Sequence, residues 1–256
     1  MAKLLVEAKI YVAGTTNLGD FLNSLPVLSG LEKTYGKFDL LLRPEMSKFN
    51  GIIEFLEYQN IFNSVKFGRL DDKKSMVMAS WHPHIKIKQN RNNSNRPTET
   101  CNYENFMKQY NLLDFDVDDD FLIKIPEYDI EIKNNYYVGD RWVGPGLDER
   151  RESHILSHLK DFEFIDFNRP LLENAYIIKN LKKPFITNFT GVGMLADLLN
   201  VPLYCVWKAE DWKPEFRKGD DVSWDNGKNI QQVFEKHFYL NRKGKLVHAN
   251  ELNKLL

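Results

Sequence analysis

The stretch Val12-Ala13-Gly14-Thr15-Thr16-Asn17-Leu18-Gly19-Asp20 decides the fold. The apolar run 8–13 is short and ends at Gly14, which is typical of a buried strand. Behind the turn, apolar residues recur at helical spacing, at Phe21, Leu22, Leu25, Leu28 and Leu31. The stretch therefore predicts a strand, a glycine-containing turn and a helix over 20–35, which Pro26 should bend. Its G-x-x-x-x-G spacing lacks the Lys-Ser/Thr of a nucleotide-triphosphate P-loop.

The same alternation of strand and helix patterns continues along the chain. In the first half we expect further strands at 38–42, 61–67 and 75–80 and a helix over 45–56; an Asn-rich, basic loop at 81–100 and a helix over 103–110 follow. In the second half we expect strands at 136–139, 162–166, 184–188 and 202–207, and helices at 149–160, 171–181, 191–199, 229–237 and from 250. Strands separated by helices of this length predict parallel sheets with right-handed crossovers.

We therefore predict an α/β protein of two Rossmann-like domains, 1–126 and 127–256, that face each other across a cleft. Small-molecule sites favour such clefts. The last helix could pack back on the first domain. The acidic run 114–120 is interpreted as solvated and as part of the inter-domain linker, since charge runs usually form solvated segments.

Composition excludes several classes of protein. The chain has 256 residues, a formal net charge of −1 and two cysteines that form no motif. No apolar run approaches the ~18 residues of a membrane span, and Met1-Ala2-Lys3 does not open a signal peptide. We expect a cytoplasmic protein with reduced thiols. A G-x-G-x-x-G fingerprint is missing, which disfavours a nicotinamide dehydrogenase.

Several residues are candidates for chemistry, each beside a plainer interpretation. Asp20 follows the first strand, where open α/β sheets bind ligands, or it only supports the helix start. The basic loop 86–96 could contact the phosphates of a polyanion, or it is a soluble surface loop. The basic and aromatic residues at 207–218 suit a nucleic acid or a nucleotide-sugar. The Asp114-x-Asp116-x-Asp118 run departs from a calcium loop, and the His154/His158 pair lacks a third ligand. We predict no metal site.

Two segments carry a family resemblance. They are Gly19-Asp20 followed by Leu25-Pro26-Val27-Leu28, and Pro184-Phe185-Ile186-Thr187-Asn188-Phe189-Thr190-Gly191 followed by Leu195-Ala196 and Val201-Pro202-Leu203. Both resemble segments of heptosyltransferase-type enzymes, which are glycosyltransferase family 9-like and have a GT-B fold. The segment 103–113 is similar to the helix and linker that close the first domain of these enzymes.

This resemblance implies which residues act and how. The first domain would bind the acceptor and the second the nucleotide-sugar, without a metal. Asp20 would be the catalytic base. Donor-binding residues would be Arg141, Trp142, Asn188, Thr190, Gly191 and Gly193. Acceptor-binding residues would be Thr16, Asn17, Gly19, His84, Lys86, Lys88 and Arg91.

The resemblance leaves three functions open. Our leading prediction is an inverting transfer from a UDP-sugar to hydroxymethylated cytosine in phage DNA, by a glucosyl- or arabinosyltransferase acting in the host cytoplasm on a flipped base. The second is heptosyltransferase-like transfer to lipopolysaccharide or another glycan. The third is a non-catalytic nucleotide-sugar or polyanion-binding protein, because Phe189 and Met194 stand where the family has an acid and a histidine.

Overall fold

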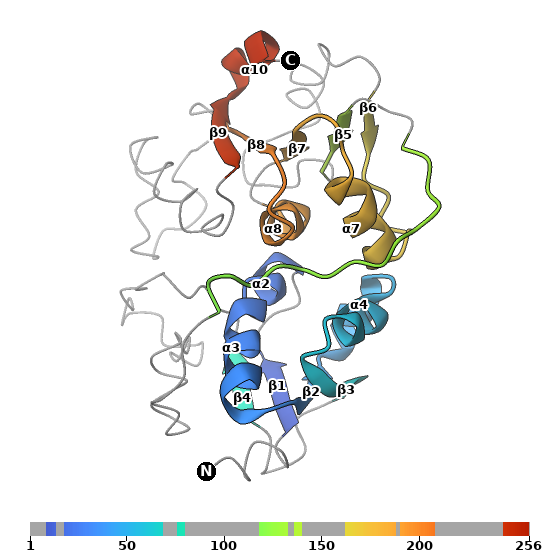
Figure 1. Ribbon diagram of the computed structural model, residues 1–256, viewed down its shortest axis with the longest axis vertical. Coiled ribbons are helices and arrows are strands. Elements are labelled where there is room, and N and C mark those ends of the chain that lie inside the picture. Colours follow the sequence, from blue (N-terminus) through green and yellow to red (C-terminus); the bar gives the residue numbers. More distant parts are fainter. Residues whose placement is uncertain are drawn as a thin grey trace. The chain divides into compact units, whose positions relative to one another are not determined.

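The computed structural model describes residues 9–13, 18–68, 76–79, 118–132, 136–139, 162–187, 190–207 and 243–255. The chain divides into two compact units (Figure 1). Unit 1 contains the described residues up to 127 and also Phe167–Asn174, and unit 2 contains the others.

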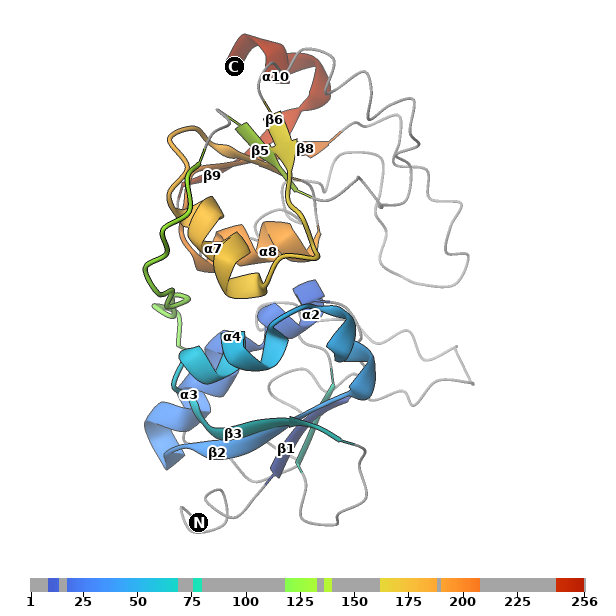
Figure 2. The same cartoon turned by 90° about the vertical axis from the view of Figure 1, so that its right-hand side faces the viewer.

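Unit 1 is built on a parallel sheet of four strands, in the order β3-β2-β1-β4. The strands are β1 (Lys9–Ala13), β2 (Phe38–Leu42), β3 (Phe62–Phe67) and β4 (Met76–Ala79), and every neighbouring pair is parallel. Helices α3 (Leu25–Tyr35) and α4 (Ile52–Tyr58) lie on the same face of this sheet (Figure 2). The predicted parallel sheet is confirmed, and each of these four strands lies within or equals its predicted range.

The predicted helix over 20–35 is two helices, α2 (Leu18–Leu22) and α3. Pro26 occupies the first turn of α3, where a helix does not use the backbone N–H that proline lacks. The helical segment is therefore interrupted before Pro26 and is not bent at it. Between the helices, the Ser24 amide donates to the Phe21 carbonyl at 2.9 Å. Helix α3 ends at Gly36, which has a φ of +84° and closes the last turn as expected.

The predicted helix over 45–56 is also interrupted. It consists of the 3-10 helix η1 (Pro44–Lys48) and of α4, separated by Gly51 with a φ of +70°. The third stretch of unit 1 meets this turn: the Leu171 amide donates to the Asn50 carbonyl at 3.0 Å, and the Asn50 side chain donates to the Asn168 carbonyl at 2.6 Å. Because a Cβ on Gly51 would lie 3.1 Å from the Pro170 Cβ, glycine suits this position for its size as well as for its backbone angle.

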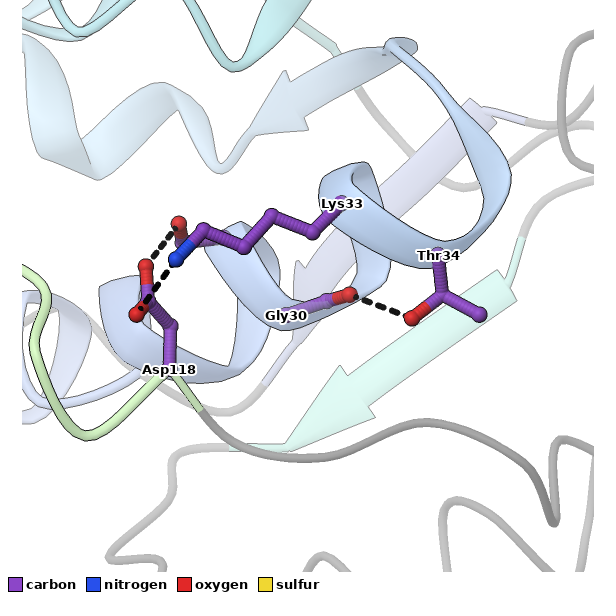
Figure 3. Close-up of polar contacts among 5 residues, drawn as sticks. Gly30, Lys33, Thr34 and Asp118 are labelled. Atoms are coloured by element: carbon purple, nitrogen blue, oxygen red, sulfur yellow. Dashed lines mark hydrogen bonds and ion pairs between the residues drawn. The ribbon is translucent and has the colours of Figure 1, made fainter.

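The acidic run is not wholly solvated, contrary to the expectation. The Asp118 side chain is only 7% exposed, its Oδ1 lies 2.7 Å from Lys33 Nζ, and its Oδ2 accepts a hydrogen bond from Ser29 at 2.6 Å (Figure 3). Phe121 and Ile123 are buried. Residues 118–124 are therefore part of unit 1.

Unit 2 is built on a second parallel sheet, of five strands, in the order β6-β5-β7-β8-β9. The strands are β5 (Tyr136–Val138), β6 (Phe162–Phe164), β7 (Phe185–Thr187), β8 (Leu203–Trp207) and β9 (Gly244–His248). Helix α7 (Leu171–Lys179) links β6 to β7, and α8 (Gly191–Leu198) links β7 to β8. Strand β9 was not predicted from the sequence.

The last helix, α10 (Ala249–Leu255), packs on the sheet of unit 2. Leu252 is 1% exposed and forms a core cluster with four strand residues, Val138, Ile186, Val206 and Val247. Helices α7 and α8 lie on the opposite face of this sheet (Figure 2). An apolar side chain of α10 therefore completes the core of the second domain, and the expectation that this helix packs on the first domain stays a prediction.

Candidate functional site

Each sheet has one point at which the strand order reverses. In unit 1 the chain leaves β1 for β2 and β3 on one side and returns to β4 on the other side of β1. In unit 2 it leaves β5 for β6 and then returns to β7 on the other side of β5. Open α/β sheets bind ligands beyond the carboxyl ends of the strands at such a switch point. The fold therefore assigns one candidate site to each unit.

The site of unit 2 begins where β5 and β7 end side by side. The Gly139 amide, directly after β5, donates to the Ile186 carbonyl of β7 at 2.8 Å. A Cβ on Gly139 would lie 3.0 Å from Thr187 Oγ1, and Thr187 is only 1% exposed. The absence of a side chain at Gly139 thus lets the two strand ends approach each other. Gly139 and Thr187 both lie in strands predicted from the sequence, but their close approach was not predicted.

The turn after β7 leads into α8 through Thr190. Thr190 has an extended backbone, its hydroxyl accepts a hydrogen bond from the Gly193 amide at 3.5 Å, and its carbonyl accepts one from the Met194 amide at 3.1 Å. Thr190 is therefore the N-cap residue of α8. The predicted strand and helix are confirmed, while the donor-binding roles of Thr190, Gly191 and Gly193 stay predictions.

The first turn of α8 offers main-chain donors and apolar side chains. Val192 is 2% exposed and Met194 is 3% exposed, so both side chains belong to the core, and the turn contains no acid. The first amides of a helix lack partners within it and favour anions. This end of α8 suits an anionic group held by the backbone.

One buried acid in α8 was passed over in the sequence analysis. Asp197 lies in the second half of the helix and is 0% exposed. Its signal in the sequence is a single charge inside the apolar run 192–199. Burying a carboxylate costs free energy unless hydrogen bonds or an opposite charge compensate for the lost water. Asp197 is one of the buried residues of α8.

The site of unit 1 begins where β1 and β4 end, with Ala13 paired to Ala79. Helix α2 follows β1 after residues 14–17, and it carries the backbone of Gly19 and Asp20. Phe21 and Leu22, both 0% exposed, anchor this short helix in the core. Asp20 thus belongs to the segment that follows the switch strand, as predicted.

The remaining predicted site residues lie outside the described ranges, as does the side chain of Asp20. They fall on four segments, each following a switch strand in the sequence. They are Thr16 and Asn17 after β1, His84, Lys86, Lys88 and Arg91 after β4, Arg141 and Trp142 after β5, and Asn188 after β7.

Within the ranges given above, no group of three or more His, Cys, Asp or Glu side chains could hold a metal ion. No helix in this part of the chain has the length and apolar character needed to cross a membrane.

Comparison with known proteins gives likeness in structure only. No protein-family model matches the sequence, and no curated protein matches it by sequence. The E. coli heptosyltransferase WaaC with ADP superposes at a TM-score of 0.52 and 11% identity, covering 97% of this chain and 98% of that chain. E. coli ADP-heptose LPS heptosyltransferase II superposes at 0.53 and 11%, with the same coverages.

A glycosyltransferase of family 9 from Veillonella parvula DSM 2008 superposes at a TM-score of 0.52 and 12% identity, covering 98% of this chain and 88% of that chain. Identities this low say nothing of substrates, but the agreement extends over nearly all of the chain. With its two parallel sheets, the protein has the GT-B fold of these glycosyltransferases.

Proposed function

We propose that this protein is a metal-independent glycosyltransferase that moves a sugar from a nucleotide-sugar to an acceptor hydroxyl. The observation that carries the proposal is the topology. The segments that follow the switch strands of unit 1 contain the predicted base and most of the predicted acceptor-binding residues, and those of unit 2 contain the predicted donor-binding residues. The three solved structures named above, which share this fold, are glycosyltransferases.

Unit 2 would bind the donor. The diphosphate is an anion, and the N-terminus of α8, with Thr190 as N-cap, offers main-chain amides to it. The same amides would stabilise the charge that develops on the departing nucleoside diphosphate. Arg141 would add a cation and Trp142 a surface on which the base stacks.

Unit 1 would bind the acceptor, and Asp20 would remove its proton. In an inverting transfer the acceptor oxygen forms a bond to the anomeric carbon while the bond from this carbon to the diphosphate breaks. The acceptor proton passes to the Asp20 carboxylate, and the nucleoside diphosphate leaves with the electron pair. The base contributes about 10²–10⁴-fold in such reactions.

Among the acceptors, we favour heptosyltransferase-like transfer to a glycan. Two of the matched structures are heptosyltransferases, and one of them contains ADP. Phage DNA as acceptor depended on two basic segments, 86–96 and 207–218, of which only Trp207 lies in the described ranges. DNA and a UDP-sugar therefore remain candidates for the assay. The cytoplasmic location predicted from the sequence stays a prediction.

The rival function is binding without transfer. It is favoured by Met194, whose side chain is 3% exposed and so belongs to the core, at the position where the resembled family has a histidine. Such a protein would bind a nucleotide-sugar without releasing a nucleoside diphosphate.

The experiment is a transfer assay with the full chain, using ADP- and UDP-sugars, lipopolysaccharide-type glycans and hydroxymethylated DNA. We expect acceptor-dependent release of a nucleoside diphosphate that a chelator does not reduce. Asp20→Asn should lower kcat at least about 10²-fold, whereas Asp120→Asn, which changes an exposed acid of unit 1, should not. Donor binding without release in any combination would favour the rival.

A further inference from the structure

Residues 118–124, which we call the strap, are held on unit 1 at both ends. At the start, Asp118 meets Lys33 and Ser29 of α3, and the Asp118 amide donates to the Pro26 carbonyl at 3.0 Å. Figure 3 shows Lys33 extended along α3 towards Asp118, while Thr34 bonds to Gly30 of the same helix on another side. Phe121 and Ile123 are buried between the two ends.

At the end of the strap, a side-chain amide acts as a backbone partner. Gln59, which is 2% exposed, accepts a hydrogen bond from the Lys124 amide at 2.8 Å and donates one to the Lys124 carbonyl at 3.2 Å. Its Nε2 also lies 2.8 Å from the Phe55 carbonyl of α4. These three hydrogen bonds fix the orientation of the buried Gln59 side chain. The Gln59 side chain in turn holds the backbone of Lys124 in place.

The first anchor on unit 2 follows almost at once. The rings of Tyr128 and Tyr176 meet edge to face, with centroids 5.6 Å apart, and both residues belong to unit 2. Only Ile125, Pro126 and Glu127 lie between Lys124 and Tyr128. The described chain changes unit again at both ends of Phe167–Asn174.

We propose that residues 125–127 form a short joint, fixed in length by Gln59 on one side and by Tyr176 on the other. These three residues are then the first of the described chain's three crossings between the units, and Asp118, Asp119 and Asp120 of the acidic run belong to the strap on unit 1. Pro126 restricts the joint further because its ring fixes φ. A strap that opened would lengthen this connection from three residues to about ten, while the crossings at 166/167 and 174/175 would stay as they are.

Trypsin tests the strap in the folded full chain. The Lys124 residue is exposed, but its amide and carbonyl are bonded to Gln59, so we expect cleavage after Lys124 to require opening of the strap. We expect Gln59→Leu to raise the rate of cleavage after Lys124 about tenfold or more, and Lys33→Ala, a surface change, to raise it severalfold. Thr34→Ala, which removes a bond of α3 that does not involve the strap, should leave the rate unchanged. Cleavage after Lys182, in an exposed turn of unit 2, is the internal control.

Two outcomes would overturn the proposal. One is equal cleavage after Lys124 in the wild type, Gln59→Leu and Lys33→Ala. The other is a rise after Lys182 of the same size as after Lys124, which would give Gln59 a role in overall stability and none in the strap.

The consequence for turnover rests on the proposed function. Inserting Gly-Ser after Pro126 should lower kcat several-fold while leaving the donor Kd, measured by calorimetry, unchanged. The same insertion after Lys182 is the matched control and should change neither. An unchanged kcat after the first insertion would contradict a fixed joint. If the wild type transfers no sugar, the proposed function fails, and the trypsin result still decides the strap.

Discussion

At the scale of the residue, Gly139 sets the spacing of the two switch strands of unit 2. Adding a methyl group there would place it 3.0 Å from Thr187 Oγ1 and 3.4 Å from Phe185 Cζ. Thr187 is β-branched and buried, and Phe185 is 0% exposed, so neither side chain can move aside. We predict that Gly139→Ala lowers the free energy of unfolding by about 1–3 kcal/mol and weakens donor binding.

Gly68→Ala is the matched control for this substitution. Its new Cβ would lie 3.2 Å from Leu41 Cδ2, the end of a longer side chain that is not fully buried. We expect a loss below about 0.5 kcal/mol. Urea unfolding of both variants makes the comparison, and equal losses would show that the contact of Gly139 with Thr187 has no special weight.

Burial makes Cys205 a source of pH dependence. Desolvation raises the pKa of its thiol well above the ordinary value, and the side chain is 0% exposed. The folded protein therefore holds this proton more tightly than the unfolded chain does. The buried, protonated thiol therefore contributes fully to the free energy of unfolding below the ordinary thiol pKa. This contribution is lost as the pH rises above that value.

The prediction is a difference between the wild type and Cys205→Ala. Above about pH 9, the free energy of unfolding of the wild type should fall by about 1.4 kcal/mol per pH unit relative to the variant. Urea unfolding between neutral pH and about pH 10 measures the difference. A constant difference over this interval would mean that the thiol ionises as readily in the folded protein as in the unfolded one.

At the scale of the element, α10 offers a matched pair of leucines. Leu252 is 1% exposed in the core of unit 2, and Leu255 of the same helix is 48% exposed. Leu252→Ala should lower the free energy of unfolding by about 2–5 kcal/mol, and Leu255→Ala by less than about 0.5 kcal/mol. Thermal or urea unfolding decides, and a small loss at Leu252 would mean that α10 does not complete this core.

Sequence patterns predicted the described elements well where each pattern was long or bounded by glycine. The strand 38–42 and the end of α3 at Gly36 are found where expected. The helices over 20–35 and 45–56 are each divided, because Pro26 and Gly51 favour new helix starts over bends. Strand β9 was missed because its five residues include Lys245 and His248 and show no clear apolar run.

The strap is the case in which local patterns could not suffice. A run of aspartates is usually solvated, but Asp118 is fixed by partners 85 and 89 residues away along the chain, at Lys33 and Ser29. The hydrogen bonds of Gln59 to Lys124 span 65 residues. Contacts over such separations leave no periodicity in the sequence, and only the fold brings the residues together.

At the scale of the whole molecule, the strand orders connect the fold to the chemistry. The sequence predicted parallel sheets, but it did not contain the order of the strands, which depends on how distant segments pair. The order places the segments with Asp20 and with Thr190 at the switch point of their own sheets. Their roles, and the roles of the nine predicted residues outside the described ranges, stay predictions.

The most direct measurement of the central claim is sugar transfer by the full chain compared with Asp20→Asn, with donor binding followed by calorimetry on the same samples. The account predicts that the wild type releases a nucleoside diphosphate only with an acceptor present, and that Asp20→Asn binds the donor with unchanged Kd but turns over at least about 10²-fold more slowly. Full turnover by Asp20→Asn, or no donor binding by the wild type with any ADP- or UDP-sugar, would contradict it.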